Sequence, residues 1–107
     1  MYLRLESRQM ALEITEEEKT KINREFPMGK VLEGRVIKHW PFGVFLDIEH
    51  ESFIGLIRIV DMGFKSPANS DMFPKIGSLV EGEILGCDFS NGQVVLKSDF
   101  GKRKIGN

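Results

Sequence analysis

The residues most suited to binding a ligand are aromatic side chains near the middle of the sequence, with cationic side chains close to them. Phe42 and Phe45 lie close together, with Lys38 before them and Arg58 after them. Flat apolar rings stack on unpaired bases and cations attract a phosphate backbone, so this mixture could hold a single-stranded nucleic acid. From chain position alone, packing under a loop or in a secondary core is an equal alternative for both rings.

The other reactive side chains do not indicate catalysis. His39 and His50 have no neighbouring acidic–histidine motif, so they do not form a metal-site pattern. Cys87 has no basic partner beside it in sequence and is better explained as a small buried hydrophobic residue. The glycines do not form a phosphate-binding loop of a known type. We therefore expect no enzymatic activity, no metal and no cofactor.

Length and charge narrow the class of protein. The 107 residues suffice for one domain with a modest core. Because 15 Lys and Arg balance 16 Asp and Glu, the formal net charge is -1, and any nucleic-acid site must be a local patch. A single cysteine excludes an intramolecular disulfide. No segment resembles a secretory signal or a transmembrane helix, so we expect a cytoplasmic protein without a membrane partner.

Residues 1–27 differ in composition from the rest of the chain. They are densely charged, and all 11 glycines lie beyond residue 28. Thr15 and Glu18 form a capping-box pattern that predicts a short helix over residues 15–25, ended by Pro27. Its apolar stripe is thin, so we expect weak docking and an extension that the domain does not need; the stripe comprises Ile14, Ile22 and Phe26.

From residue 29 onward the pattern predicts β-structure. We expect strands over Val31–His39, Val44–Ile48, Phe53–Val60, Leu79–Leu85 and Gln93–Lys97. Asn91-Gly92 favours a tight hairpin, and residues 61–75 resemble a loop with a short helical turn. This arrangement is typical of a small closed barrel, and the OB fold is the leading five-stranded example. The core candidates are Ile37, Leu46, Ile48, Leu56, Val80, Ile84, Val94 and Leu96.

The motifs from Met28 to Lys97 resemble the S1 RNA-binding domain, the repeat of ribosomal protein S1 that also occurs in polynucleotide phosphorylase. No fragment is specific alone, but all of them occur in the order and spacing of the family. The matching fragments are Gly34-Arg-Val36, Phe42-Gly-Val-Phe45-Leu-Asp47, Gly55-Leu-Ile-Arg-Ile59, Asp61-Met62-Gly-Phe64-Lys65 and Gly77–Asp88. The resemblance implies an all-β, five-stranded OB-fold barrel of S1 type, preceded here by a short helical extension.

The resemblance also implies an RNA-binding face. The two signature aromatic residues of the family correspond to Phe42 and Phe45, and its aspartate corresponds to Asp88. Its histidine is replaced by Arg58, which keeps a donor with a permanent charge. A family arginine is replaced by Gln93, which removes a positive charge.

Several further residues have two explanations. Phe64 stands where some repeats have an exposed tryptophan, and it could contact RNA or cap the barrel. Trp40 could stack on a base or plug the barrel rim, and the rim is favoured. His39 occupies a position that is usually aliphatic, for which the sequence offers no account. Arg58 interrupts an apolar run, where a buried charge would be costly. The candidate phosphate contacts are Lys38, Arg58, Lys65 and Lys97.

These observations lead to one functional hypothesis and one alternative. We expect a non-enzymatic module that binds single-stranded RNA across the second and third strands, on a ribosome or in a ribonuclease complex. The expected organisation is an extension over residues 1–27, a domain over 28–100 and a basic flexible tail over 101–107. The alternative is a protein-interaction module that docks a partner through the barrel or the charged helix. A small nuclease has little support, and the oligomeric state is not predicted.

Overall fold

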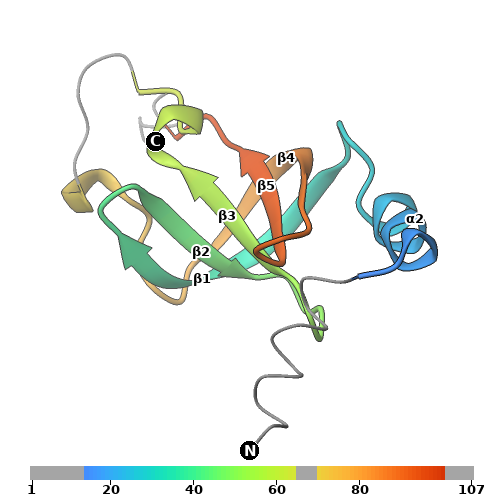
Figure 1. Ribbon diagram of the computed structural model, residues 1–107. Helices are drawn as coiled ribbons and strands as arrows, with labels where there is room; N and C mark the ends of the chain where they lie inside the picture. Colours follow the sequence, from blue (N-terminus) through green and yellow to red (C-terminus); the bar gives the residue numbers. More distant parts are fainter. Residues whose placement is uncertain (1–13, 65–69, 101–107) are drawn as a thin grey trace, which may run out of the picture.

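The computed structural model describes residues 14–64 and 70–100, so Lys65 and the predicted tail lie outside the described residues. Helix α2 precedes a barrel of strands β1 to β5, and two single 3-10 turns lie between β3 and β4 (Figure 1). No helix in the described part of the chain is long and apolar enough to cross a membrane. The bounds are α2 Glu16–Glu25, β1 Val31–Trp40, β2 Gly43–Asp47, β3 Ile54–Arg58, η1 Ile59–Asp61, η2 Ser70–Met72, β4 Leu79–Asp88 and β5 Gln93–Lys97.

The strands close into a barrel in the order β1-β2-β3-β5-β4, with β1 also paired to β4. All pairs are antiparallel except β3 with β5. The two long strands, β1 and β4, each contain a register shift, at Val36/Lys38 and at Ile84/Gly86. Such bulges bend a strand, which lets it pair with two neighbours around a small barrel. The predicted OB-fold barrel is confirmed.

The barrel interior is filled by alternate aliphatic side chains of the strands. Six of the predicted core residues are buried, namely Leu46, Ile48, Val80, Ile84, Val94 and Leu96. Two predictions are wrong. Ile37 is 44% exposed, because Val36 takes the inward position and Ile37 lies at the bulge. Leu56 is half-buried on the outer face, because Gly55 and Ile57 on either side of it point inward.

Helix α2 covers one end of the barrel more firmly than its narrow stripe suggests. The predicted capping box is present: the amide of Glu18 donates to Thr15 Oγ1 at 3.0 Å, and the amide of Thr15 donates to Glu18 Oε1 at 3.0 Å. Ile22 and Phe26 are both buried in the same apolar cluster as the barrel core. The helix therefore contributes to the core, although the sequence indicated weak docking.

His50 connects this helix to the loop between β2 and β3. Its Nδ1 accepts hydrogen bonds from the amides of Ser52 and Phe53, each at 3.0 Å. Its ring lies edge-on to Phe26 and to Phe53, with centroids 5.5 Å away in both cases. The imidazole thus fixes the loop and packs against the helix end at the same time.

The described parts of the connection between β3 and β4 cover the other end of the barrel. Met62 and Phe73 are buried, and Phe64 is partly buried against the same cluster. His39 Nε2 donates to the carbonyl of Pro74 at 2.8 Å, and its ring lies edge-on to Phe73 at 5.4 Å. This contact accounts for a histidine at a usually aliphatic position, because the side chain fastens the connection to the barrel end.

Candidate nucleic-acid interface

The bulge in β1 decides which side chains of the β1–β2 hairpin face outward. Beyond it, Lys38 lies opposite Phe45 and Trp40 lies opposite Gly43. Because the neighbours of Phe45 in β2 are fully buried, Phe45 and its partner Lys38 face outward. Trp40, two residues after Lys38, shares this face. We call Lys38, Trp40, Phe42, Phe45 and Arg58 the aromatic surface.

Trp40 and Phe45 contact each other on this surface. Their ring centroids are 5.9 Å apart with an interplanar angle of 81°, an edge-to-face arrangement. Lys38 Nζ lies 5.0 Å from the centroid of the Trp40 ring, within the range of a cation–π interaction. Trp40 is 43% exposed and Phe45 is half-buried. The favoured placement of Trp40 as a plug in the rim is therefore wrong.

Phe42 projects from the turn between β1 and β2 and is 74% exposed. Its backbone is nevertheless held, because its carbonyl accepts a hydrogen bond from the amide of Ile59 at 2.7 Å. The next residue, Gly43, is packed against β3, where a Cβ atom would overlap the carbonyl oxygen of Ile57. The exposed ring adds to the apolar area of the aromatic surface, and an apolar patch in contact with water is typical of a binding surface.

Arg58 lies at the end of β3, opposite Gly43. Its side chain is 51% exposed, and its Nε donates to Asp61 Oδ2 at 2.7 Å. The sequence suggested a costly charge within an apolar strand. That interpretation is wrong, because the strand ends at Arg58 and the guanidinium is both paired and in contact with water. The pair reduces the positive charge that this residue offers to a phosphate.

Asp88 and Gln93 do not join the aromatic surface. They face each other at the hairpin between β4 and β5, where Gln93 pairs with Ile54 at the start of β3. Arg58 lies at the opposite end of β3. The Asp88 carboxylate accepts hydrogen bonds from Asn91, at 3.3 Å from its amide and 2.8 Å from its Nδ2. Asp88 therefore has a structural role in the turn, and its contact with RNA stays a prediction.

The remaining predicted residues have mixed positions. Phe64 packs against the core, as its capping alternative requires. Leu96 pairs with Ile57 in the parallel β3–β5 pair, so the next residues, Lys97 and Arg58, end these two strands on the same side of the barrel. Its Nζ is 3.9 Å from Glu83 Oε1, which partly neutralises it. Lys65 lies outside the described residues.

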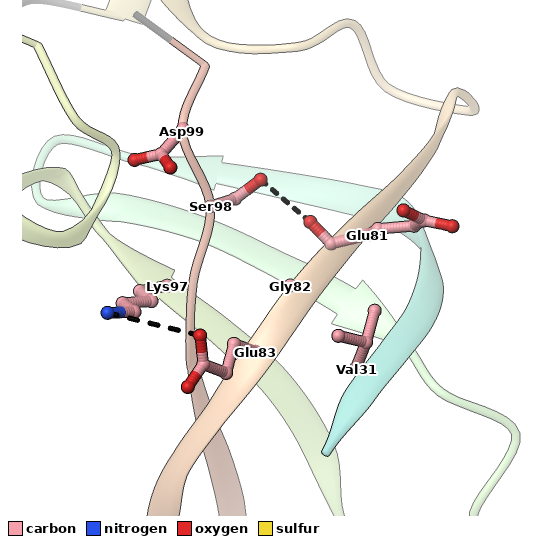
Figure 2. A pocket seen from close by; sticks show the side chains of 7 residues that line it. All are labelled: Val31, Glu81, Gly82, Glu83, Lys97, Ser98 and Asp99. Atoms are coloured by element: carbon pink, nitrogen blue, oxygen red, sulfur yellow. Dashed lines mark hydrogen bonds and ion pairs between the residues drawn. The ribbon is translucent and has the colours of Figure 1, made fainter. Parts of the chain in front are cut away.

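The β1–β4 side of the barrel is acidic, in contrast to the aromatic surface. A shallow hollow of about 290 Å³ lies on this side, lined among others by Glu81, Glu83 and Asp99. In Figure 2, Glu83 is paired with Lys97, whereas the carboxylates of Glu81 and Asp99 have no cation beside them among the residues drawn. Glu33 lies directly opposite Glu81 in the β1–β4 pair, which adds a further carboxylate. These charges repel a phosphate backbone, so a nucleic acid is favoured on the aromatic surface. Within residues 14–64 and 70–100, no three His, Cys, Asp or Glu residues are grouped so that they could hold a metal ion.

Comparisons with known proteins agree on the fold. No family model matches the chain, and no curated protein matches its sequence. The solved structure of GSP13 from Bacillus subtilis is similar with a TM-score of 0.60 and 22% identity, over 77% of this chain and 62% of that one. A chain of the a/eIF2alpha–aDim2p–rRNA complex from Pyrococcus horikoshii is similar with a TM-score of 0.58 and 19% identity, over 67% of this chain and 44% of that one.

A third similar structure is RNase R of Mycoplasma genitalium in complex with ribose methylated single-stranded RNA. Its TM-score is 0.55 at 22% identity, over 77% of this chain and 14% of that one. The present chain thus spans less than two thirds of each of these three proteins. With the strand order of the barrel, these similarities confirm the five-stranded OB fold that the resemblance to the S1 family implies.

Proposed function

We propose that the chain is a non-enzymatic module that binds single-stranded RNA on the aromatic surface. The observation that carries this proposal is the outward placement of Phe42 and Phe45 beside the cations Lys38 and Arg58. Unpaired bases stack on exposed rings, and each stacked base contributes about 1–3 kcal/mol. The RNA-binding part of the chain is proposed to lie within residues 28–100, with Lys65 as a further phosphate contact, while helix α2 completes the core of this domain from outside that range.

The charge distribution supports weak, salt-sensitive binding. If Lys38 and Arg58 each neutralise one phosphate, the logarithm of the binding constant should fall with the logarithm of salt with a slope of about -1.4. Such a slope is small because only two cations are counted as phosphate contacts, and the pairing of Arg58 with Asp61 would reduce it further. Weak binding suits a module that acts inside a larger RNA–protein assembly, such as a ribosome or a ribonuclease complex.

The comparisons support the proposal through the fold alone. The similar RNase R structure contains single-stranded RNA, and the Pyrococcus complex contains rRNA. The matched region is 14% of the RNase R chain, a small part of that enzyme. We therefore extend to this chain the binding of RNA and not the ribonuclease reaction.

A titration of a labelled short single-stranded RNA, followed by fluorescence anisotropy at several salt concentrations, tests this proposal. Phe42→Ala should weaken binding by roughly 5- to 150-fold, the equivalent of one lost stack. The matched control is Leu79→Ala, which truncates a side chain that is 53% exposed on the acidic side of the barrel. Leu79→Ala should bind RNA like the natural protein. An absence of binding at low salt would refute the proposal and favour docking of a protein partner.

A further inference from the structure

We propose that Trp40 is a base-stacking residue and that the bound RNA runs along the β1–β2 hairpin. This inference rests on the proposed function and changes which strands are expected to contact the RNA. The sequence predicts binding across the second and third strands, whereas Trp40 lies at the end of the first. An indole presents a larger stacking area than a phenyl ring, so Trp40 would be the widest ring on the aromatic surface.

The packing of Trp40 is hard to explain as part of the core. Trp40 is 43% exposed and lies outside the buried cluster that fills the barrel. Its partner across the strand pair is Gly43, so no side chain lies opposite the indole. Exposed apolar side chains that lie together in a patch, as Trp40 and Phe45 do, mark a contact with a ligand more often than those scattered singly.

The contact with Phe45 holds the indole without enclosing it. The two rings meet at an angle of 81°, so Phe45 limits the rotation of Trp40 while the indole stays partly open to solvent. A ring that is already oriented loses less conformational entropy when a base stacks on it. Because the rings touch, two consecutive bases could stack on Trp40 and Phe45.

Lys38 supplies the charge that such a nucleotide needs. Its Nζ lies 5.0 Å from the indole centroid, and the side chain is exposed. A cation–π contact at an exposed site is weak, so a phosphate can draw the ammonium away from the ring. Arg58 lies in the same row of the sheet, because both Trp40 and Arg58 pair with Gly43. A base on the indole would therefore have Lys38 beside it, with Arg58 two strands away in the same row.

The single tryptophan of the chain makes the stack directly observable. The full chain is titrated with a short single-stranded RNA and, separately, with an abasic oligonucleotide that carries the same number of phosphates. Stacking should quench Trp40 fluorescence and reduce its accessibility to acrylamide with the RNA only. Equal quenching by the abasic strand would overturn the inference, because phosphates alone would then cause the signal.

Affinities of variants separate stacking from an indirect effect through Phe45. Trp40→Ala should weaken RNA binding by roughly 5- to 150-fold, while Trp40→Phe should retain most of the affinity. The control Ile37→Ala, which truncates an exposed neighbour in β1, should have no effect. If Trp40 only positions Phe45, the double variant Trp40→Ala/Phe45→Ala will bind no more weakly than Phe45→Ala, and that result refutes direct stacking.

The failure of this inference can be distinguished from the failure of the proposed function. Loss of affinity in Phe42→Ala with wild-type affinity in Trp40→Ala would overturn the role of Trp40 and leave RNA binding in place. A natural protein that binds no single-stranded RNA would refute both.

Discussion

Replacing Gly43 by alanine should force β2 and β3 apart at the end of the sheet where the aromatic surface lies. A Cβ atom at this position would overlap the carbonyl oxygen of Ile57 and would lie 2.9 Å from the Cα of Arg58. Both atoms belong to the backbone of β3, so no side-chain rotation can relieve the contact. Non-bonded carbon atoms rest about 3.5–4.0 Å apart, so the strands must separate by roughly an ångström.

The expected cost follows from this displacement. Overpacking in a well-packed region costs about 1–3 kcal/mol, and each weakened hydrogen bond of the ladder adds about 1 kcal/mol. We therefore expect Gly43→Ala to lower the free energy of unfolding by about 2–4 kcal/mol. For a domain of this size, such a loss lowers Tm by roughly 10–25 °C. RNA affinity should fall as well, because Phe42 and Phe45 lie on either side of the displaced residue.

Gly86→Ala is the matched control in another strand. A Cβ atom at Gly86 would have no atom within 4 Å. This substitution should be neutral or should stabilise the fold by up to about 1 kcal/mol, because alanine restricts the unfolded chain. Urea denaturation followed by circular dichroism measures both variants, and Trp40 fluorescence serves as a second probe. A free energy of unfolding for Gly43→Ala within about 0.5 kcal/mol of the natural protein would refute the steric argument.

Three other substitutions or measurements test separate parts of the fold. Phe26→Ala should lower the free energy of unfolding by about 3–5 kcal/mol, since its ring is buried between α2 and the barrel. If urea denaturation shows a loss below 1 kcal/mol, the domain does not need the extension. His50→Ala should cost about 1–3 kcal/mol, because the amides of Ser52 and Phe53 lose their acceptor, and faster hydrogen exchange at these two amides checks the cause. Burial raises the pKa of the Cys87 thiol, so folded protein should react with iodoacetamide more slowly than urea-unfolded protein near pH 8. The unfolded thiol ionises first as pH rises, so the contribution of Cys87 to stability should decline above the ordinary thiol pKa; equal alkylation rates in both states would contradict the shift.

The parts of the site that follow a simple alternation could be predicted from the sequence. Phe45 faces outward and Leu46 inward because side chains alternate along β2. The bulge at Ile37 could not be predicted, since the interruption depends on how β1 bends around a closed barrel. Strict alternation along β1 without this bulge is what misplaces Ile37 in the core.

The two barrel ends could not be predicted for a related reason. Phe26 packs against His50, which lies far from it in sequence and in turn packs against Phe53. The role of His39 at a usually aliphatic position is explained only by its hydrogen bond to the carbonyl of Pro74, a residue distant in sequence. Patterns within one segment predict which face of a strand is apolar, but they do not reveal which distant segment covers an end.

The parallel pairing of β3 with β5 has a consequence for the order of folding. β1, β2 and β3 are neighbours in both sequence and space, so their contacts close short loops. Pairing of β5 with β3 and of β4 with β1 joins distant segments, and such contacts form more slowly. The aromatic surface lies on the part of the sheet with local contacts. We therefore expect it to be assembled in the transition state for folding, before the ring of strands is complete.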